Sequence, residues 1–389
     1  MSGRLLHLVC TAAVAAGALF APSPALAAPG PGTGSAAAAT APDGRSLAAL
    51  LTDLQKLYRQ AEQATETYNS TEERLRAKRA EAARLEKELA GARLSLHDSR
   101  GAAGRLARQQ YQNSSEISPY VRLLLARDPQ RALEERHVIG QLARQRAETV
   151  GRLTVDERRR DALARAARKA LDDQLTLTER RRKDRDRVRG KLAEVEELLA
   201  SLSADRLAEL AELEETGTAK AQRTFMASGA LSSGSTPSRE GGKALRYAVR
   251  QLGKPYAWGA EGPQSYDCSG LTSRAWEHAG RAVPRTSQEQ WAQLPRIPLA
   301  ELRPGDLVVY FPEATHVALY LGDGMVVQAP RPGARIKVSP IAANPVLGAV
   351  RPDPGGEPLR RYTPPELPRD AGDGSDEGYS FAEPVTEAR

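Results

Sequence analysis

The strongest constraint on this chain is a repeat of apolar side chains that runs from Leu47 to Leu106. Their spacing alternates between three and four residues, with polar interruptions at Thr71, Lys78 and Ser99, and the segment contains no proline. Glu, Arg and Lys occupy many of the positions between them. This heptad pattern predicts a coiled-coil helix, which at ~1.5 Å per residue would be on the order of 90 Å long.

A second amphipathic segment follows a break in this pattern. Residues 113–115, Pro119 and Pro129 interrupt the repeat, and helical spacing then resumes less regularly as far as Leu202. Two long segments around a breaker predict an antiparallel coiled-coil helical hairpin over residues 45–215. An apolar cluster near its tip, residues 120–125 with Leu133, leaves two alternatives open. It caps the hairpin by packing on itself, or it docks a partner such as a membrane protein or a division-complex protein.

The composition agrees with a rod joined to a small globular domain. Only 5% of the residues are aromatic, too few to fill two large cores. The net charge of +7 is modest for 389 residues, and it does not indicate nucleic acid as a partner. The Arg-rich runs at 158–160 and 180–183 are interpreted as solvated faces of the rod, because acidic residues interleave with them throughout.

The first residues indicate export. Arg4, an apolar run from Leu5 to Phe20 and an A-x-A-like site at 25–27 predict a signal peptide over residues 1–27 and a secreted protein. A membrane-anchoring helix is the alternative, although Pro22 and Pro24 break the apolar stretch. Residues 28–44, rich in Ala, Pro and Gly, predict a flexible lead-in.

Three further segments follow the rod. Residues 216–242 are dominated by Gly, Ser, Thr and Ala, and they predict a linker. Residues 243–352 contain strand-like runs and turn signals, and they predict a globular domain. Residues 353–389 are rich in Pro, Gly and acidic residues, and they predict a disordered tail.

Removal of the signal peptide with Cys10 would leave Cys268 as the only cysteine of the mature chain. An unpaired cysteine in an exported protein suggests intermolecular pairing or a reactive thiol. A buried inert cysteine is the alternative, but the sequence around Cys268 is polar and turn-like. A helix is expected from here to Gly280, which places the thiol at a helix N-terminus. There the N–H groups and the helix dipole favour a thiolate and can hold an oxyanion.

The base for this thiol is found by elimination. His97 and His137 belong to the rod, and His278 lies ten residues along the same helix as Cys268, roughly 15 Å away. His316 remains. It begins the second of three expected strands, at 307–311, 316–321 and 325–329.

A hairpin turn at residues 322–324 joins the last two of these strands. The turn places Gln328 beside His316, where its amide can orient the imidazole. Cys268, His316 and Gln328 would then form the nucleophile, base and orienting group of a cysteine hydrolase.

The globular domain resembles the NlpC/P60 family of cell-wall cysteine peptidases. The resemblance covers about 110 of 389 residues. It is carried by five motifs in the family's order and spacing: Gly253-Lys254-Pro255-Tyr256-Ala257-Trp258-Gly259, Asp267-Cys268-Ser269-Gly270-Leu271, Pro284-Arg285-Thr286-Ser287, Leu302-Arg303-Pro304-Gly305-Asp306-Leu307, and His316-Val317 through Leu321-Gly322-Asp323-Gly324.

This resemblance implies a papain-like α+β fold after the coiled coil. It implies a cell-wall enzyme that hydrolyses peptidoglycan stem peptides, usually between D-glutamate and a diamino acid, without a metal or cofactor. By position it implies roles for seven residues. Cys268 matches the nucleophile, His316 the base, Gln328 the third polar residue and Tyr256 an oxyanion-assisting tyrosine, while Asp267, Ser269 and Arg285 match substrate contacts.

Three positions depart from the family pattern. Gln328 stands where His, Asn or Glu is common, and it can accept a hydrogen bond but adds no charge. Ala260 and Tyr266 replace Gly and Phe.

The leading hypothesis is a peptidoglycan endopeptidase that is regulated or positioned by its coiled coil. The alternatives are a coiled-coil scaffold whose domain only binds wall peptides, and an amidase or acyltransferase of similar fold.

Overall fold

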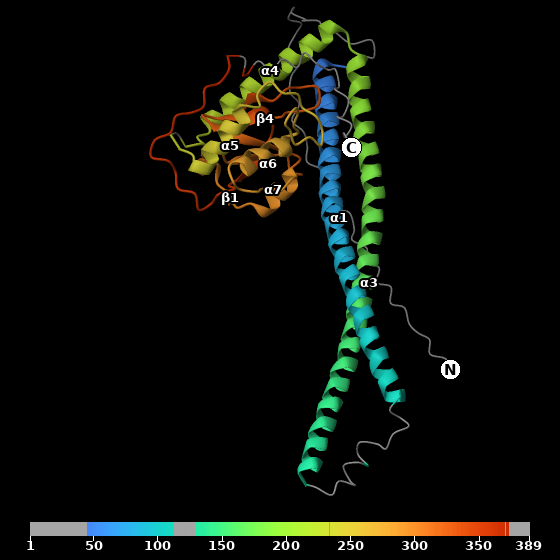
Figure 1. Ribbon diagram of the computed structural model, residues 1–389. Helices are drawn as coiled ribbons and strands as arrows, with labels where there is room; N and C mark the ends of the chain where they lie inside the picture. Colours follow the sequence, from blue (N-terminus) through green and yellow to red (C-terminus); the bar gives the residue numbers. More distant parts are fainter. Residues whose placement is uncertain (1–44, 113–120, 122–128, 233, 370, 373–389) are drawn as a thin grey trace, which may run out of the picture. The chain divides into compact units, whose positions relative to one another are not determined.

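A computed structural model describes residues 45–112, 121, 129–232, 234–369 and 371–372 (Figure 1). The elements discussed below belong to one compact unit, residues 47–389. The predicted signal peptide, the lead-in, most of the apolar tip cluster and the end of the tail lie outside the described residues.

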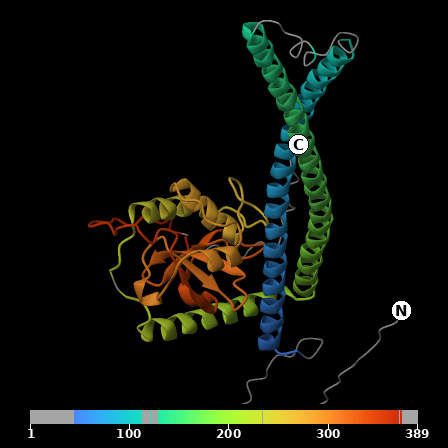
Figure 2. The same cartoon turned by 90° about the horizontal axis from the view of Figure 1, so that it is seen from below.

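The rod is a pair of long helices, α1 (Leu47–Gln112) and α3 (Pro129–Ala200), that pack along one another (Figures 1 and 2). The expected pair of long helices is therefore confirmed, but the second helix ends at Ala200 and not at residue 215. Side chains of the α1 repeat such as Leu54, Leu75 and Leu85 are buried. Each polar interruption of that repeat meets an acidic residue of α3, which adds a specific pairing to the apolar seam. The pairs are Thr71 with Asp184 (2.8 Å), Lys78 with Asp173 (3.4 Å) and Ser99 with Asp156.

The segment predicted as a linker is largely helical, which corrects that prediction. Helix α4 runs from Ala204 to Ala227, with the Ser203 side chain as its N-cap. Its C-terminal half lies on the globular domain, where the side-chain amide of Gln222 donates to the carbonyl of Gly324 (2.9 Å) and its oxygen accepts from Ala342 N–H (3.1 Å). The small polar residues of 216–227 are compatible with a helix, and these tertiary contacts supply the stability that their sequence does not.

The globular domain is a six-stranded antiparallel sheet covered by helices. The strand order is β1-β6-β2-β3-β4-β5, and the expected strands at 307–311, 316–321 and 325–329 are present within one residue. The helices are α5 (Arg239–Val249), α6 (Cys268–His278) and α7 (Ser287–Gln293), with short turns η2 (Leu299–Glu301) and η3 (Ile341–Ala343). The strands are β1 (Arg296–Ile297), β2 (Leu307–Tyr310), β3 (His316–Gly322), β4 (Met325–Gln328), β5 (Lys337–Pro340) and β6 (Val346–Val350).

The sheet has an apolar core on each face. Helices α5 and α6 pack on one face around Trp276 and Leu245, which are fully buried. Val308 and Tyr320 belong to the core on the other face, against which Phe225 of α4 packs. This α+β arrangement places the first turn of α6 against β3.

The beginning of the tail is ordered, which corrects the prediction of disorder from residue 353. The buried Asp353 carboxylate pairs with Arg303 (2.7 Å) and accepts from Ser238, the N-cap of α5. Further along, Val338 N–H donates to the carbonyl of Ala371 (2.8 Å). Pro- and Gly-rich composition disfavours helices and strands, but it does not prevent an irregular segment from docking through a buried ion pair.

Candidate active site

Cys268 is the first residue of α6, and its thiol is buried. Asp267 precedes it as the N-cap and accepts a hydrogen bond from Gly270 N–H (2.6 Å). Because the cap uses the N–H of Gly270, it leaves the N–H groups of Cys268 and Ser269 available at the positive end of the helix. Position 270 requires glycine for a steric reason, because a Cβ there would lie 2.2 Å from the carbonyl oxygen of Ala260.

His316 begins β3 beside this helix turn. The backbone N–H of the next residue, Val317, is near enough to the Cys268 sulfur to act against the rise in the thiol pKa, and α6 contacts β3 along this turn. The Nε2 atom of His316 lies 2.7 Å from Oε1 of Gln328. Because an amide oxygen only accepts, this bond fixes the proton on Nε2 and makes Nδ1 the basic nitrogen of the neutral ring.

The hairpin register differs from the simplest expectation. Leu319 pairs with Val327, and the register shifts between Tyr320 and Gly322. Continued along the strands, this pairing puts Gln328 diagonal to His316 rather than directly opposite. The two side chains still share a face because side chains in a strand alternate with period two.

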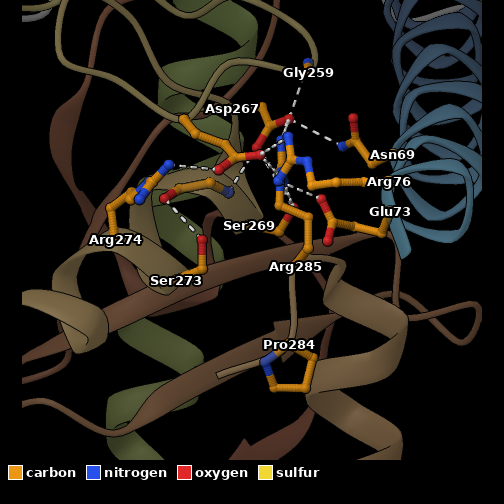
Figure 3. A network of polar contacts seen from close by, with 12 residues as sticks. Asn69, Glu73, Arg76, Gly259, Asp267, Ser269, Ser273, Arg274, Pro284 and Arg285 are labelled. Atoms are coloured by element: carbon orange, nitrogen blue, oxygen red, sulfur yellow. Dashed lines mark hydrogen bonds and ion pairs between the residues drawn. The ribbon is translucent and has the colours of Figure 1, made fainter. Parts of the chain in front are cut away.

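The other residues expected at the site surround the thiol. Asp267 and Arg285 form a buried ion pair (2.7 Å), and Arg285 Nη1 donates to the Ser269 hydroxyl (2.8 Å) (Figure 3). Tyr256 is buried close enough to Cys268 for the two groups to affect each other electrostatically. The structure therefore brings together Cys268, His316, Gln328, Tyr256, Asp267, Ser269 and Arg285. Within the described ranges, no group of His, Cys, Asp and Glu side chains is arranged to hold a metal ion.

Sequence analysis missed three residues of α1 at this site, Glu62, Glu66 and Asn69. Oε1 of Glu66 accepts from the Ser269 hydroxyl (2.7 Å) and lies 3.7 Å from Cys268 Sγ, and Oε2 accepts from Ser287 N–H (2.9 Å). Between the seam positions of a coiled coil these residues resemble a solvated face. Only the docking of α1 on the domain distinguishes them.

Residues 253–348 match the family described as NlpC/P60. These residues form an NlpC/P60 domain. Among curated proteins, a "Probable endopeptidase" of Corynebacterium glutamicum is 40% identical over 116 residues, which are 30% of this chain and 56% of that protein. The chain thus spans little more than half the length of this relative.

Two solved structures are similar to the NlpC/P60 domain. One is the NlpC/p60 domain of the peptidoglycan hydrolase SagA, with 30% identity, 28% of this chain and 97% of that chain covered, and a TM-score of 0.27. The other is RipD of Mycobacterium tuberculosis, described as a non-catalytic NlpC/p60 domain protein with a peptidoglycan-binding function. It is 28% identical, the match covers 30% of this chain and 98% of that chain, and the TM-score is 0.27.

The electrostatics of the NlpC/P60 domain reflect the buried carboxylates. Burial raises the pKa of the Cys268 thiol well above its ordinary value, and the negative charges of Glu66, Asp267 and Glu62 raise it further. Burial opposes a charged imidazole at His316, but Glu62, Gln328 and Glu66 together outweigh it, so the pKa of His316 lies above its ordinary value. With α1 in place, both the thiol and the imidazole therefore favour their protonated forms.

Proposed function

We propose that this protein is a secreted, cell-wall-associated peptidoglycan endopeptidase with a Cys/His thiol mechanism. The observation that carries the proposal is the array of Cys268, His316 and Gln328 inside an NlpC/P60 domain. The thiol lies at the N-terminus of a helix that packs on β3, the strand that His316 begins, and an amide holds the Nε2 of that imidazole. No described helix is long and apolar enough to cross a membrane.

The proposed reaction has two halves, formation of a thioester on Cys268 and hydrolysis of that thioester. His316 Nδ1 takes the thiol proton, and the thiolate attacks the scissile carbonyl carbon. The N–H of Cys268 and the hydroxyl of Tyr256 stabilise the oxyanion. The imidazolium then protonates the departing amine, leaving a thioester. Water attacks this thioester after giving a proton to His316, which releases the carboxylic acid and restores the thiol.

The Glu66 side chain suggests what the substrate carries near the scissile bond. Its carboxylate occupies a site made by the Ser269 hydroxyl and the Ser287 N–H, close to the Arg285 guanidinium. We call these three groups the carboxylate subsite. A D-glutamyl residue linked through its γ-carboxyl keeps a free α-carboxylate that could take this position. The subsite thus supports cleavage between D-glutamate and a diamino acid.

The test uses the whole chain, both as the wild type and as Glu62→Ala/Glu66→Ala, with defined muropeptides and mass spectrometry of the products. We expect one new D-glutamyl carboxylate and one new free amine per cut. Cys268→Ala in the same background should lose activity by about 10³-fold or more, as expected on removal of a nucleophile. Binding of muropeptides without cleavage would instead favour a scaffold, and release of another bond would favour an amidase or acyltransferase.

A second comparison tests the carboxylate subsite directly. Muropeptides whose D-glutamate carries an α-amide in place of the α-carboxylate lose the negative charge but keep the scissile bond. We expect kcat/KM to fall at least about tenfold for the amidated substrate. Burial under α1 is the main cause that raises the pKa of Glu66, and without that burial a charge-assisted hydrogen bond to a carboxylate contributes on the order of 1.5–3 kcal/mol. Equal cleavage of the two substrates would argue against recognition of this carboxylate.

A further inference from the structure

The helix α1 carries three polar side chains into the site that the NlpC/P60 domain would use for catalysis. Glu62 and Glu66 lie four residues apart, and Asn69 follows three residues later, so the three share one helix face. Their exposed fractions are only 7%, 1% and 3%. Figure 3 shows α1 beside the Asp267–Arg285 network, with Asn69 directed at it. We call Glu62, Glu66 and Asn69 the α1 latch.

Each latch residue engages a group with a proposed role in the reaction. Glu66 fills the carboxylate subsite and reaches the thiol. Glu62 Oε1 lies 3.3 Å from His316 Nδ1, the nitrogen left to act as base once Gln328 holds Nε2. The Asn69 amide donates to Asp267 Oδ2 (3.0 Å). A substrate peptide could not use these groups while α1 is docked.

The neighbouring contacts show that this face of α1 is fitted to the domain. Tyr68 meets Trp258 edge-on, with ring centroids 5.1 Å apart. Gly259, whose φ of +73° favours glycine, lies against the same helix, and an added Cβ there would be in van der Waals contact with Tyr68 and Asn69, 3.5 Å from each. Contacts from aromatic, amide and carboxylate side chains therefore converge on a single helical segment.

We propose that residues 62–69 of α1 are an intramolecular substrate mimic that keeps the peptidase latent. The proposal rests on the proposed function, because it identifies how the same site is regulated. Glu66 stands in for the substrate carboxylate, and Glu62 holds the base in its protonated form. Latency ends when this segment leaves the domain. The contacts are mostly polar, so water can replace them on release.

The experiment measures access to the thiol separately from peptidase activity. The whole chain is treated with iodoacetamide, and the peptide containing Cys268 is followed by mass spectrometry, so that Cys10 does not interfere. We expect alkylation of Glu62→Ala/Glu66→Ala to be at least tenfold faster than that of the wild type, and muropeptide hydrolysis to rise in parallel. Glu86→Ala/Glu88→Ala is the matched control, because it removes two exposed carboxylates of the same helix and should change neither rate.

The two readouts separate the two proposals. Alkylation that is unchanged in Glu62→Ala/Glu66→Ala overturns the latch, whatever the hydrolysis assay shows. Faster alkylation without hydrolysis of any muropeptide supports the latch and overturns the peptidase. If the double variant unfolds, as judged by circular dichroism, Asn69→Ala replaces it. That variant leaves both glutamates in place and should still raise alkylation several-fold, and an unchanged rate would overturn the latch.

Discussion

The α1 latch should weaken as the pH rises, because Glu66 binds its proton more tightly when docked. Burial, reinforced by the charge of Asp267 and opposed by Arg285, raises the pKa of Glu66 from 4.5 to about 7. Released from the domain, the same carboxyl returns to its ordinary value. The charged or titratable groups that face it are, from the domain, Asp267, Cys268, Arg285 and His316, with Tyr256 nearby, and Glu62 from its own helix.

The size of the effect follows from proton linkage. The docked state holds more protons between pH 4.5 and 7, so docking is favoured below this range and loses that advantage as the pH rises through it. Proton binding by Glu66 multiplies the equilibrium constant for docking by (1 + 10^(7−pH))/(1 + 10^(4.5−pH)). This factor is about 77 at pH 5 and about 1.1 at pH 8. The docking equilibrium should therefore weaken about 70-fold, or by about 2.5 kcal/mol. His316 acts in the same direction, because its pKa is also raised in the docked state.

The assay is alkylation of Cys268 in the whole chain at pH 5, 6, 7 and 8. Each rate is divided by that of Glu62→Ala/Glu66→Ala at the same pH, which cancels the titration of the thiol itself. The wild-type ratio should rise by tens of fold from pH 5 to 8. Glu66→Gln copies the uncharged carboxyl, so its ratio should rise much less and stay below that of the wild type at pH 8. A wild-type ratio that is constant, or that falls with pH, would refute this reasoning.

Three further changes test the architecture. Gln328→Ala removes the acceptor that orients the imidazole and should lower kcat about fivefold with KM little changed, measured on muropeptides, since a neutral hydrogen bond contributes about 1 kcal/mol; an unchanged kcat would argue against orientation. Gly270→Ala forces a Cβ against the Ala260 carbonyl and should cost about 1–3 kcal/mol of stability, seen as a lower urea midpoint. Asp353→Ala removes the nearer of the two carboxylates that pair with the buried Arg303 and leaves Asp306 at 3.9 Å, so it should cost about 1.5–3 kcal/mol. Glu366→Ala, in the exposed part of the tail, should leave the midpoint unchanged.

Local patterns predicted much of this structure because they reflect local physics. The 3–4 spacing of α1, the strand at His316 and the helix start at Cys268 all depend on residues close in sequence. Gln328 was expected on the correct face although its register was wrong, because alternation along a strand survives a shift of two residues. The resemblance to the NlpC/P60 family, and no local pattern, led us to expect Tyr256, Asp267, Ser269 and Arg285 around the thiol.

Apart from this hairpin register, the sequence-based errors concern contacts between distant segments. Residues 216–227 form the end of α4 because the helix docks on the domain, and no local pattern shows that docking. Asp353 orders the start of the tail through Arg303, fifty residues away in the chain. Glu66 contacts Ser287 across 221 residues, and by itself it has the appearance of any solvated glutamate of a coiled coil.

Because α1 is one unbroken helix of 66 residues, about 100 Å long, a pull at one end would move the whole helix along its axis. The result would depend on the direction of the pull. An axial slide of one turn, about 5.4 Å, exchanges the side chain at a fixed point for the one four positions away. Pulled toward its tip, α1 would bring Glu62 to the place of Glu66 and substitute one acid for another. Pulled toward Leu47, it would bring Ser70 there instead. Because serine has no carboxylate, only this movement would leave the carboxylate subsite empty.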